Sequence, residues 1–576
     1  MITNMKTKIF AIAAMGLLTM GMTSCGENFL EVSSKTEGTT GNFYSNEAAA
    51  SRALIGCYDG WQRTVSNGPT FAFHYLSELL SDECFGGTGN ADARNSAVVD
   101  RFDMGEDNSQ QNLHNTLWES YYAAIYRVNE LLSRSEGISW SSERAHGQLI
   151  GEARAIRGIL YFDLARIFEN VPLLTAPSTD NVPQAPVDDV YQVIFDDLKY
   201  AAANIPADAY PKASSSTNDG RITCYAAKAM LARAYLFYTG VYGKEPAGVT
   251  KSEVLQGLED IISSGEYSLI PLYKNLWYCA STHWEGSNTL GWVEKTTYAG
   301  EDNAENILTM KFNYTSDYNG NAGGNNAIQM FSIRGGTYKA PYGQGWGGAT
   351  VPAKFYNSFP NGDQRRDASI IDLAAEGIAS MSSYVEKAIP DQREYTGYFN
   401  KKYTARSGYH KSESDGSWTL THYWDGLMAG DFQISQPIGY TLIRYADVLL
   451  MAAELGSSNG AAYLNAVHNR AYATENADGS VTTPANNIEL TQANIMEERR
   501  LEFAFEGIRY WDLLRQGVQV AAAAIVASGD KVLNGGVEGT VSYSAQNIIS
   551  KRGFQQIPQT QITLSNNVLK QNEGWK

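Results

Sequence analysis

Residues 498–517, "ERRLEFAFEGIRYWDLLRQG", place four acids and four arginines in an otherwise apolar and aromatic run. In one helix, the i,i+3 pairs would be Arg499–Glu502, Glu506–Arg509, Arg509–Asp512 and Asp512–Arg515. An arginine beside a carboxylate favours its ionised form, whereas a general acid needs a raised pKa. The apolar residues Leu501, Phe505, Ile508, Trp511 and Leu514 would face neighbouring elements. We therefore interpret this stretch as a salt-bridged scaffold helix and not as the floor of an active site.

The N-terminus has the layout of an export signal. Lys6 and Lys8 precede an apolar stretch, and small residues lead to Cys25 in "MTSC". This ending is typical of a bacterial lipobox, although an ordinary signal peptide with a chance cysteine would look similar. We expect a signal peptide at 1–24, lipidation of Cys25 and a flexible tether over 25–42. No later stretch reaches the roughly 18 apolar residues that span a bilayer, so the chain would be anchored by its acyl chains.

The composition of the chain argues against some classes of ligand and favours others. The chain has 576 residues, of which 43% are apolar and 11% aromatic, and its net charge is −17. Such an acidic chain is a poor partner for nucleic acid or for an anionic membrane surface. Its 35 tyrosines suit wet binding surfaces, because they combine an apolar face with a polar edge. Cysteines 57, 84, 224 and 279 show no metal-type spacing, and they could form two disulfides or remain free, as we favour for at least two.

Helical periodicity dominates two parts of the chain. Over 43–268 the segments alternate in pairs, with Ala, Gly and Tyr at contact positions, which suggests stacking like that of tetratricopeptide repeats. Over 269–436 Gly, Asn, Tyr and Trp cluster and the periodicity lapses, so we expect an irregular insertion of loops and short strands. Helices return over 437–576, which also contains a C-terminal tail. The fold class is mainly α.

Catalytic motifs are missing from the sequence. It has no H-E-x-x-H, no P-loop, no G-x-S-x-G and no G-x-G-x-x-G. Its seven histidines are scattered without ligand spacing. The segments "EDNAEN" and "DGSWTLTHYWDG" could offer oxygens to Ca²⁺, but neither matches an EF-hand loop. We expect no cofactor and leave a structural calcium ion open.

Several segments resemble the SusD/RagB family of surface glycan-binding lipoproteins. Residues 498–517 are similar to its C-terminal signature, and "IRYADVLLMAAE" (443–454) to its other conserved helix. The lipobox, "ENFLE" after it, "YYAAIYRVNELL" (121–132) and the tail "IPQTQITLSNNVLKQNEGW" also fit, in the right order. The resemblance implies a helical body with four TPR-like helix pairs, a lipid anchor at the outer membrane and no catalysis. It also implies a partner, a SusC-like TonB-dependent transporter that the lipoprotein covers as a lid.

The resemblance also suggests where a glycan would bind. Aromatic rings bind the apolar faces of sugars, while Asp, Asn and Arg hold the hydroxyls. Relatives place such groups after the first helices and in the mid-chain insertion. In the first region the candidates are Asp82, Phe85, Asn90, Asp92 and Arg94, and in the second they are Trp277, Tyr278, Trp284, Tyr318, Trp346, Arg365 and Tyr395. No apolar period accompanies Trp277 or Trp284, so we expect exposed indoles there, although some of the insertion aromatics could be core residues.

Two other functions remain open at this point. Capture of a non-glycan nutrient such as a peptide would fit part of the family. An exported glycoside hydrolase or lyase on a helical scaffold would fit the export signal, but not the missing catalytic motifs.

Overall fold

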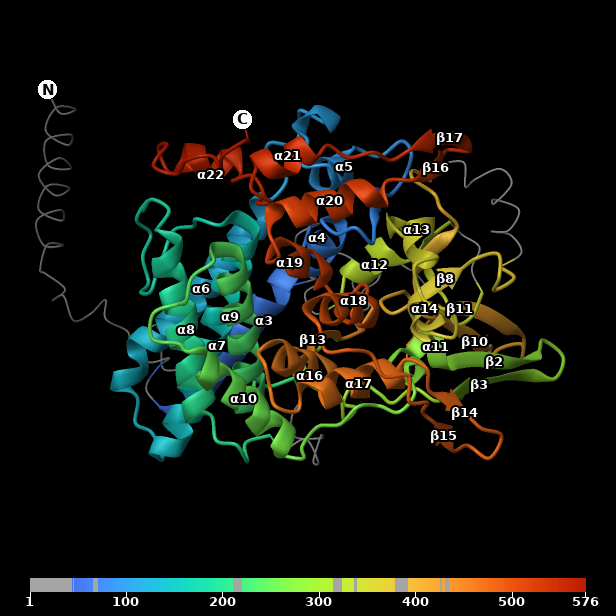
Figure 1. The fold of residues 1–576 in the computed structure, drawn as a ribbon, viewed down its shortest axis with the longest axis horizontal. Coiled ribbons are helices and arrows are strands. Elements are labelled where there is room, and N and C mark those ends of the chain that lie inside the picture. Colours follow the sequence, from blue (N-terminus) through green and yellow to red (C-terminus); the bar gives the residue numbers. More distant parts are fainter. Residues whose placement is uncertain are drawn as a thin grey trace, which may run out of the picture.

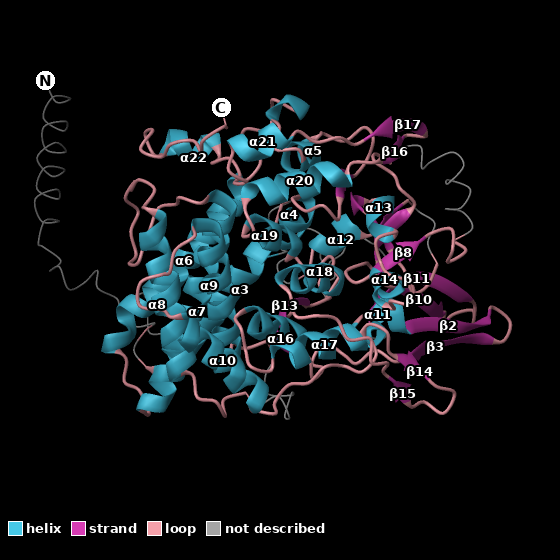
Figure 2. Ribbon diagram, in the orientation of Figure 1, coloured by secondary structure: helices cyan, strands magenta, loops and turns pink. Residues whose placement is uncertain are grey.

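The computed structural model describes residues 44, 46–65, 71–210, 220–313, 324–335, 339–378, 392–424, 427–429 and 436–575. Helices fill one side of the molecule and the short strands gather mainly on the other (Figures 1 and 2). Cys25 and Tyr318 lie outside the described residues.

Four helix pairs form the helical body, as the resemblance implied. They are α3 (Glu47–Val65) with α6 (Asn115–Arg134), α7 (Glu143–Phe168) with α8 (Val187–Asn204), α9 (Cys224–Tyr242) with α10 (Lys251–Ser263), and α16 (Tyr445–Glu454) with α17 (Gly460–Arg470). Small residues allow these helices to approach closely. A Cβ atom on Gly60 would lie 3.2 Å from Ala124, and one on Gly158 would lie 3.2 Å from Leu198. The mainly helical fold class is confirmed.

Short strands tie the middle of the chain to both ends. Strand β1 (Phe85–Gly87) pairs with β7 (Gly348–Thr350), and β4 (Asn306–Met310) pairs with β13 (Tyr440–Arg444), which leads directly into α16. The remaining pairs are β2 (Thr282–Ser287) with β3 (Gly291–Thr296), β5 (Ile333–Arg334) with β6 (Gln344–Gly345), β8 (Ile370–Asp372) with β9 (Tyr398–Asn400), β10 (Ser407–Lys411) with β11 (Trp418–Trp424), β11 with β12 (Leu427–Ala429), β14 (Thr474–Glu475) with β15 (Val481–Thr482), and β16 (Lys531–Asn534) with β17 (Val537–Thr540).

Short helices complete the fold between these elements. They are α4 (Phe73–Leu79), α5 (Asn95–Asp100), α11 (Tyr278–Ser281), α12 (Ala327–Phe331), α13 (Ala353–Tyr356), α14 (Arg365–Ser369), α18 (Gln492–Glu502), α19 (Arg509–Leu514), α20 (Val518–Ser528), α21 (Ala545–Ser550) and α22 (Gln559–Leu564).

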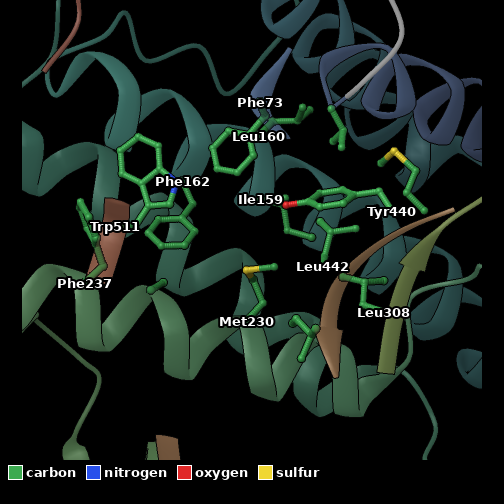
Figure 3. Packing of buried hydrophobic residues seen from close by; sticks show 14 of the residues in the cluster. Phe73, Ile159, Leu160, Phe162, Met230, Phe237, Leu308, Tyr440, Leu442 and Trp511 are labelled. Atoms are coloured by element: carbon green, nitrogen blue, oxygen red, sulfur yellow. The ribbon is translucent and has the colours of Figure 1, made fainter. Parts of the chain in front are cut away.

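The main core lies where α7, α9 and the β4–β13 pair meet the C-terminal stretch. Figure 3 shows Trp511 of α19 beside Phe162 and Phe237, with Tyr440 of β13 further along the same core. Trp511 also stacks on Phe73 with ring centroids 5.8 Å apart. The apolar residues of 498–517 therefore hold the helical body to the rest of the chain.

The charged residues of 498–517 pair differently from the expectation. The stretch is not one helix, because α18 ends at Glu502 and α19 begins at Arg509. Between them Phe505 and Gly507 have φ values of 63° and 72°, and a helix cannot continue through such left-handed conformations. Of the four expected pairs, Asp512–Arg515 is present, at 2.8 Å, whereas the other three were wrong.

The carboxylates of Glu502 and Glu506 are bound by arginines and a lysine from other elements. Glu502 accepts hydrogen bonds from Arg365, Arg444 and Arg470, and Glu506 accepts them from Arg444 and Lys402. Burial alone would raise the pKa of Glu502, but the three arginines outweigh it and lower this pKa to about 2. An ionised, fully paired carboxylate suits a scaffold and not a general acid, which supports the structural interpretation of this stretch.

Three further findings concern the cysteines, metal binding and membrane-spanning helices in the described part of the chain. Cysteines 57, 84, 224 and 279 are free and buried. Among the described residues, no group of three or more His, Cys, Asp or Glu is placed to hold a metal ion. No helix in the same residues is long and apolar enough to span a membrane.

Candidate functional site

The predicted ligand residues that are exposed or half-buried fall in two places. One is a surface groove beside Trp284, and the other is the loop that carries Asn90, Asp92 and Arg94. The segment 333–347 touches both, since Tyr342 lines the groove and Arg334 contacts the loop. The described part of this segment, residues 333–335 and 339–347, therefore links the two places.

The groove is open to solvent and has a volume of about 770 Å³. It runs between the start of the β2–β3 hairpin, the turn before Tyr342, and the buried Lys401. An adjoining hollow of about 490 Å³ lies toward α14 and shares Lys274, Ala280 and Glu475 with it. Together they offer room for several sugar units in a row.

Trp284 lines the groove and belongs to an aromatic cluster. Trp284 and Trp292 lie on the same face of the β2–β3 hairpin, because 284 pairs with 294 and 286 with 292. Tyr409 of β10 contacts both indoles. It stacks on Trp292 with centroids 3.7 Å apart, and it meets Trp284 edge-on at 5.8 Å.

A close approach between hairpins fixes the indole of Trp284. A Cβ atom on Gly408 would overlap the ring of Trp284, so only glycine at this position lets the indole cross β10. Trp284 is half-buried, with one side of its ring held by β10. An indole that lines an open groove and keeps part of its surface exposed can contact the apolar face of a sugar.

Hydroxyl and charged groups also line the groove. Thr282 donates a hydrogen bond to Thr296 at 2.7 Å, and Thr297 donates one to Asn275 at 2.6 Å. Burial raises the pKa of the Cys279 thiol to about 12, so this groove residue is not a thiolate nucleophile at neutral pH. The groove is thus equipped for binding by stacking and hydrogen bonding.

The second place is a braced, exposed loop. The side chains of Asn90, Asp92 and Arg94 are exposed, as expected of ligand contacts. Arg393 donates to the backbone oxygens of Asn90 and Asp92 at 2.9 and 2.8 Å, which fixes the loop. Arg334 lies 3.9 Å from the Asp92 carboxylate.

Trp346 and Arg94 complete the surroundings of this loop. Trp346 is half-buried, and its backbone oxygen accepts a hydrogen bond from Arg334 at 3.1 Å. Arg94 is already engaged, since its Nε donates to Glu106 at 2.9 Å. Asn90, Asp92 and Trp346 therefore remain the better-placed candidates here.

Two of the predicted residues near this loop have structural roles. Phe85 is 0% exposed and packs with Val532 and Val541. Asp82 is 6% exposed, and its two carboxylate oxygens accept hydrogen bonds from Arg509 at 2.7 and 2.9 Å. The prediction of a ligand contact at Asp82 took no account of this pairing, because its partner lies far away in the sequence.

The remaining predicted residues in the insertion are also buried. Trp277, expected to be exposed, is 6% exposed and packs edge-on against Tyr403 at 5.6 Å. Tyr278 donates to Glu294 at 2.6 Å, with the guanidinium of Arg406 4.0 Å from its ring. Their neighbours come from distant segments, so local periodicity could not reveal the burial.

Arg365 and Tyr395 likewise lie inside the protein. Arg365 is 0% exposed and pairs with Asp363, Glu498 and Glu502. Tyr395 is 3% exposed, and its backbone pairs with Leu533. A direct contact of these buried residues with ligand stays a prediction, which the geometry does not favour.

Two family models match this chain. The model described as "SusD family" matches residues 304–575, and the SusD-like model described as "Starch-binding associating with outer membrane" matches residues 29–236. The chain belongs to the SusD family of non-catalytic glycan-binding proteins. This membership sets aside the hydrolase and lyase alternatives.

Relatives and solved structures agree with this assignment. The SusD-like protein P2 of Formosa agariphila is 25% identical over 439 residues, covering 72% of this chain and 74% of that protein. The surface glycan-binding protein A from Bacteroides thetaiotaomicron, in complex with laminarihexaose, has a TM-score of 0.68 at 23% identity and covers 92% of this chain and 100% of its own. A laminarin binding SusD-like protein gives a TM-score of 0.67 at 24% identity, with coverage of 92% and 100%. At these identities the structural likeness establishes the SusD-like fold.

Sequence reasoning missed several groove residues of this SusD-family protein. Tyr409 packs against Trp284 beside the groove and stacks on Trp292, while Lys295 and Lys339 line the groove itself. The spacing of Trp284 and Trp292 across the turn "GSNTLG" is the one local signal for a hairpin with both indoles on one face. The lysines gave no such signal, because they come from separate segments.

Proposed function

We propose that this SusD-family protein binds an oligo- or polysaccharide at the cell surface in the groove beside Trp284. It then delivers the glycan to a SusC-like TonB-dependent transporter in the outer membrane. Attachment to that membrane is through acyl chains on Cys25.

The half-buried indole of Trp284 in an open groove carries this proposal. The axial C–H groups of a sugar stack on an indole face, and the hydroxyls beside the ring can exchange hydrogen bonds with Thr296, Thr297 and the charged side chains of the groove. Laminarihexaose is the ligand named for one structural relative, so a β-glucan hexasaccharide is a suitable first probe. The loop with Asn90 and Asp92 is an additional contact for a longer glycan.

Isothermal titration against a panel of hexasaccharides tests the glycan site. We expect Trp284→Ala to lose one stacking contact, ~1–2 kcal/mol or roughly ten- to thirtyfold in affinity. The matched control is Tyr126→Ala, which removes an exposed aromatic ring from helix α6 of the helical body and should leave affinity unchanged.

The outcome of this titration also distinguishes the two places. Wild-type affinity in Trp284→Ala, together with a loss in Asp92→Ala, would move the site to the braced loop. Failure to bind any glycan while retaining a peptide would overturn the proposal in favour of peptide capture. Co-purification of the membrane-bound protein with a TonB-dependent transporter tests the delivery step.

A further inference from the structure

The lining of the groove has an excess of positive charge. Its charged side chains include Lys274, Lys295, Lys339 and Lys401, but only two glutamates, Glu376 and Glu475. The whole chain carries a net charge of −17, so a groove rich in lysine runs against the overall composition. His283 also lies in the groove lining, and it contacts Glu285 at 3.0 Å.

Both glutamates are already engaged. Glu376 pairs with Lys401 at 2.5 Å and accepts a hydrogen bond from Tyr342. Lys401 is 7% exposed and also donates to the backbone oxygen of Asp367 at 2.6 Å, so it is held in place. Glu475 pairs with Lys274 at 3.1 Å.

Lys295 and Lys339 differ from the other two groove lysines in their partners. Within the described ranges, neither forms an ion pair with a carboxylate. Lys295 is exposed on strand β3, and Lys339 is exposed with its ammonium group 3.2 Å from the backbone oxygen of Glu376. Two lysines that lack a carboxylate partner among the described residues therefore line this groove.

This arrangement suits a particular class of glycan. A neutral sugar offers hydroxyls and an apolar face, which the threonines and Trp284 can bind without any cation. Unpaired ammonium groups gain most from an anion, because hydrogen bonds between ionised partners are about twice as strong as neutral ones.

We propose that the groove selects an acidic glycan, whose carboxylate or sulfate group is bound by Lys295 and Lys339. This inference rests on the proposed function and specifies the class of its ligand. Uronic acids and sulfated sugars share the required chemistry, an anionic substituent on a sugar ring.

Titration calorimetry with matched ligands tests the inference. The mature protein is titrated with hexamers of a polygalacturonate, a sulfated galactan and laminarin, each at low and at high salt. We expect the anionic hexamers to bind more tightly than laminarihexaose, and this advantage to shrink as salt screens the charges. The two acidic arms identify whether carboxylate or sulfate is preferred.

Charge-removing variants locate the interaction. In Lys295→Gln/Lys339→Gln we expect roughly tenfold or greater loss of affinity for the preferred anionic hexamer. The matched control is Lys251→Gln/Lys531→Gln, which removes two exposed lysines from α10 and β16 and thus the same net charge. The control should bind like the wild type.

The results separate the inference from the function on which it rests. Equal or tighter binding of laminarihexaose would overturn the acidic ligand while leaving glycan binding intact. Anionic binding that is unchanged in the groove variant, or equally weakened in the control, would overturn the roles of Lys295 and Lys339. Absence of binding to every hexamer would overturn the inference and count against the proposed function as well.

Discussion

Replacing Arg365 by methionine tests the buried charge network most directly. Arg365 and Asp363 are both 0% exposed at their side chains, and Arg365 donates to the Asp363 carboxylate from Nε at 3.0 Å and from Nη2 at 2.7 Å. Methionine keeps the apolar part of the side chain but leaves this carboxylate with only the backbone N–H of residue 365, at 2.9 Å. An uncompensated buried charge of this kind costs ~3–5 kcal/mol.

In Arg365→Met, the other two carboxylates that pair with Arg365 each keep another partner. Glu498 keeps its contact with His468 at 2.7 Å, and Glu502 keeps Arg444 at 2.5 Å. We therefore assign most of the loss to Asp363. With an unfolding entropy of about 2.1 cal/mol/K per residue, a mature chain of about 550 residues should melt roughly 3–4 °C lower.

Thermal melts and glycan titration on the same samples give the measurement. Arg365→Met should melt lower and bind its glycan with wild-type affinity once folded. Asp363→Asn/Arg365→Met removes both charges and should recover part of the lost stability, because no carboxylate is left unpaired. A single variant that melts like the wild type but loses the glycan would make Arg365 a ligand contact and refute the structural role.

Three further outcomes are expected. Burial, and then the charge of Asp82, raises the pKa of Glu83 from 4.5 to about 8. Wild-type stability should therefore fall as pH rises from 4.5 to about 8, and the stability of Glu83→Gln relative to the wild type should rise over the same interval. Thermal melts of both proteins near the two ends of this interval check the expectation. Equal gains at both pH values would contradict this. Asp82→Asn removes the partner of Arg509 and the charge that raises the pKa of Glu83, so it should cost ~1–3 kcal/mol and weaken the same pH dependence. Cys25→Ala should leave the membrane fraction and take up no acyl label, and a labelled, membrane-bound variant would exclude lipidation at Cys25.

Local patterns allowed the helical body to be predicted. The period of apolar residues and the small residues at contact positions reflect the helix itself and its immediate neighbour, as Gly60 against Ala124 and Gly158 against Leu198 illustrate. The exposure of Asn90 and Asp92 also agrees with their polar, Gly-rich surroundings. In each of these cases the signal is a local pattern or the local composition, even where the contacting residue, such as Ala124 for Gly60, belongs to another helix.

Pairing and burial over long distances could not be predicted in this way. Arg509 binds Asp82 across 427 positions, and Arg444 binds Glu502 across 58. Trp277 stands in an irregular segment, yet residues such as Tyr403 from a later segment enclose it. No periodicity within a window of the chain carries information about such partners.

The sequence by itself thus determined the helical class, the family and the character of 498–517 as an apolar and charged scaffold, because periodicity and composition act locally. Tertiary structure alone decided which aromatic residues are exposed and which cations are left without a carboxylate. Trp284 and Trp277 are alike in the sequence, but only Trp284 lies on a hairpin at the rim of a groove. The physical reason is that exposure and charge balance depend on every segment that packs around a side chain, and those segments come together only when the chain folds.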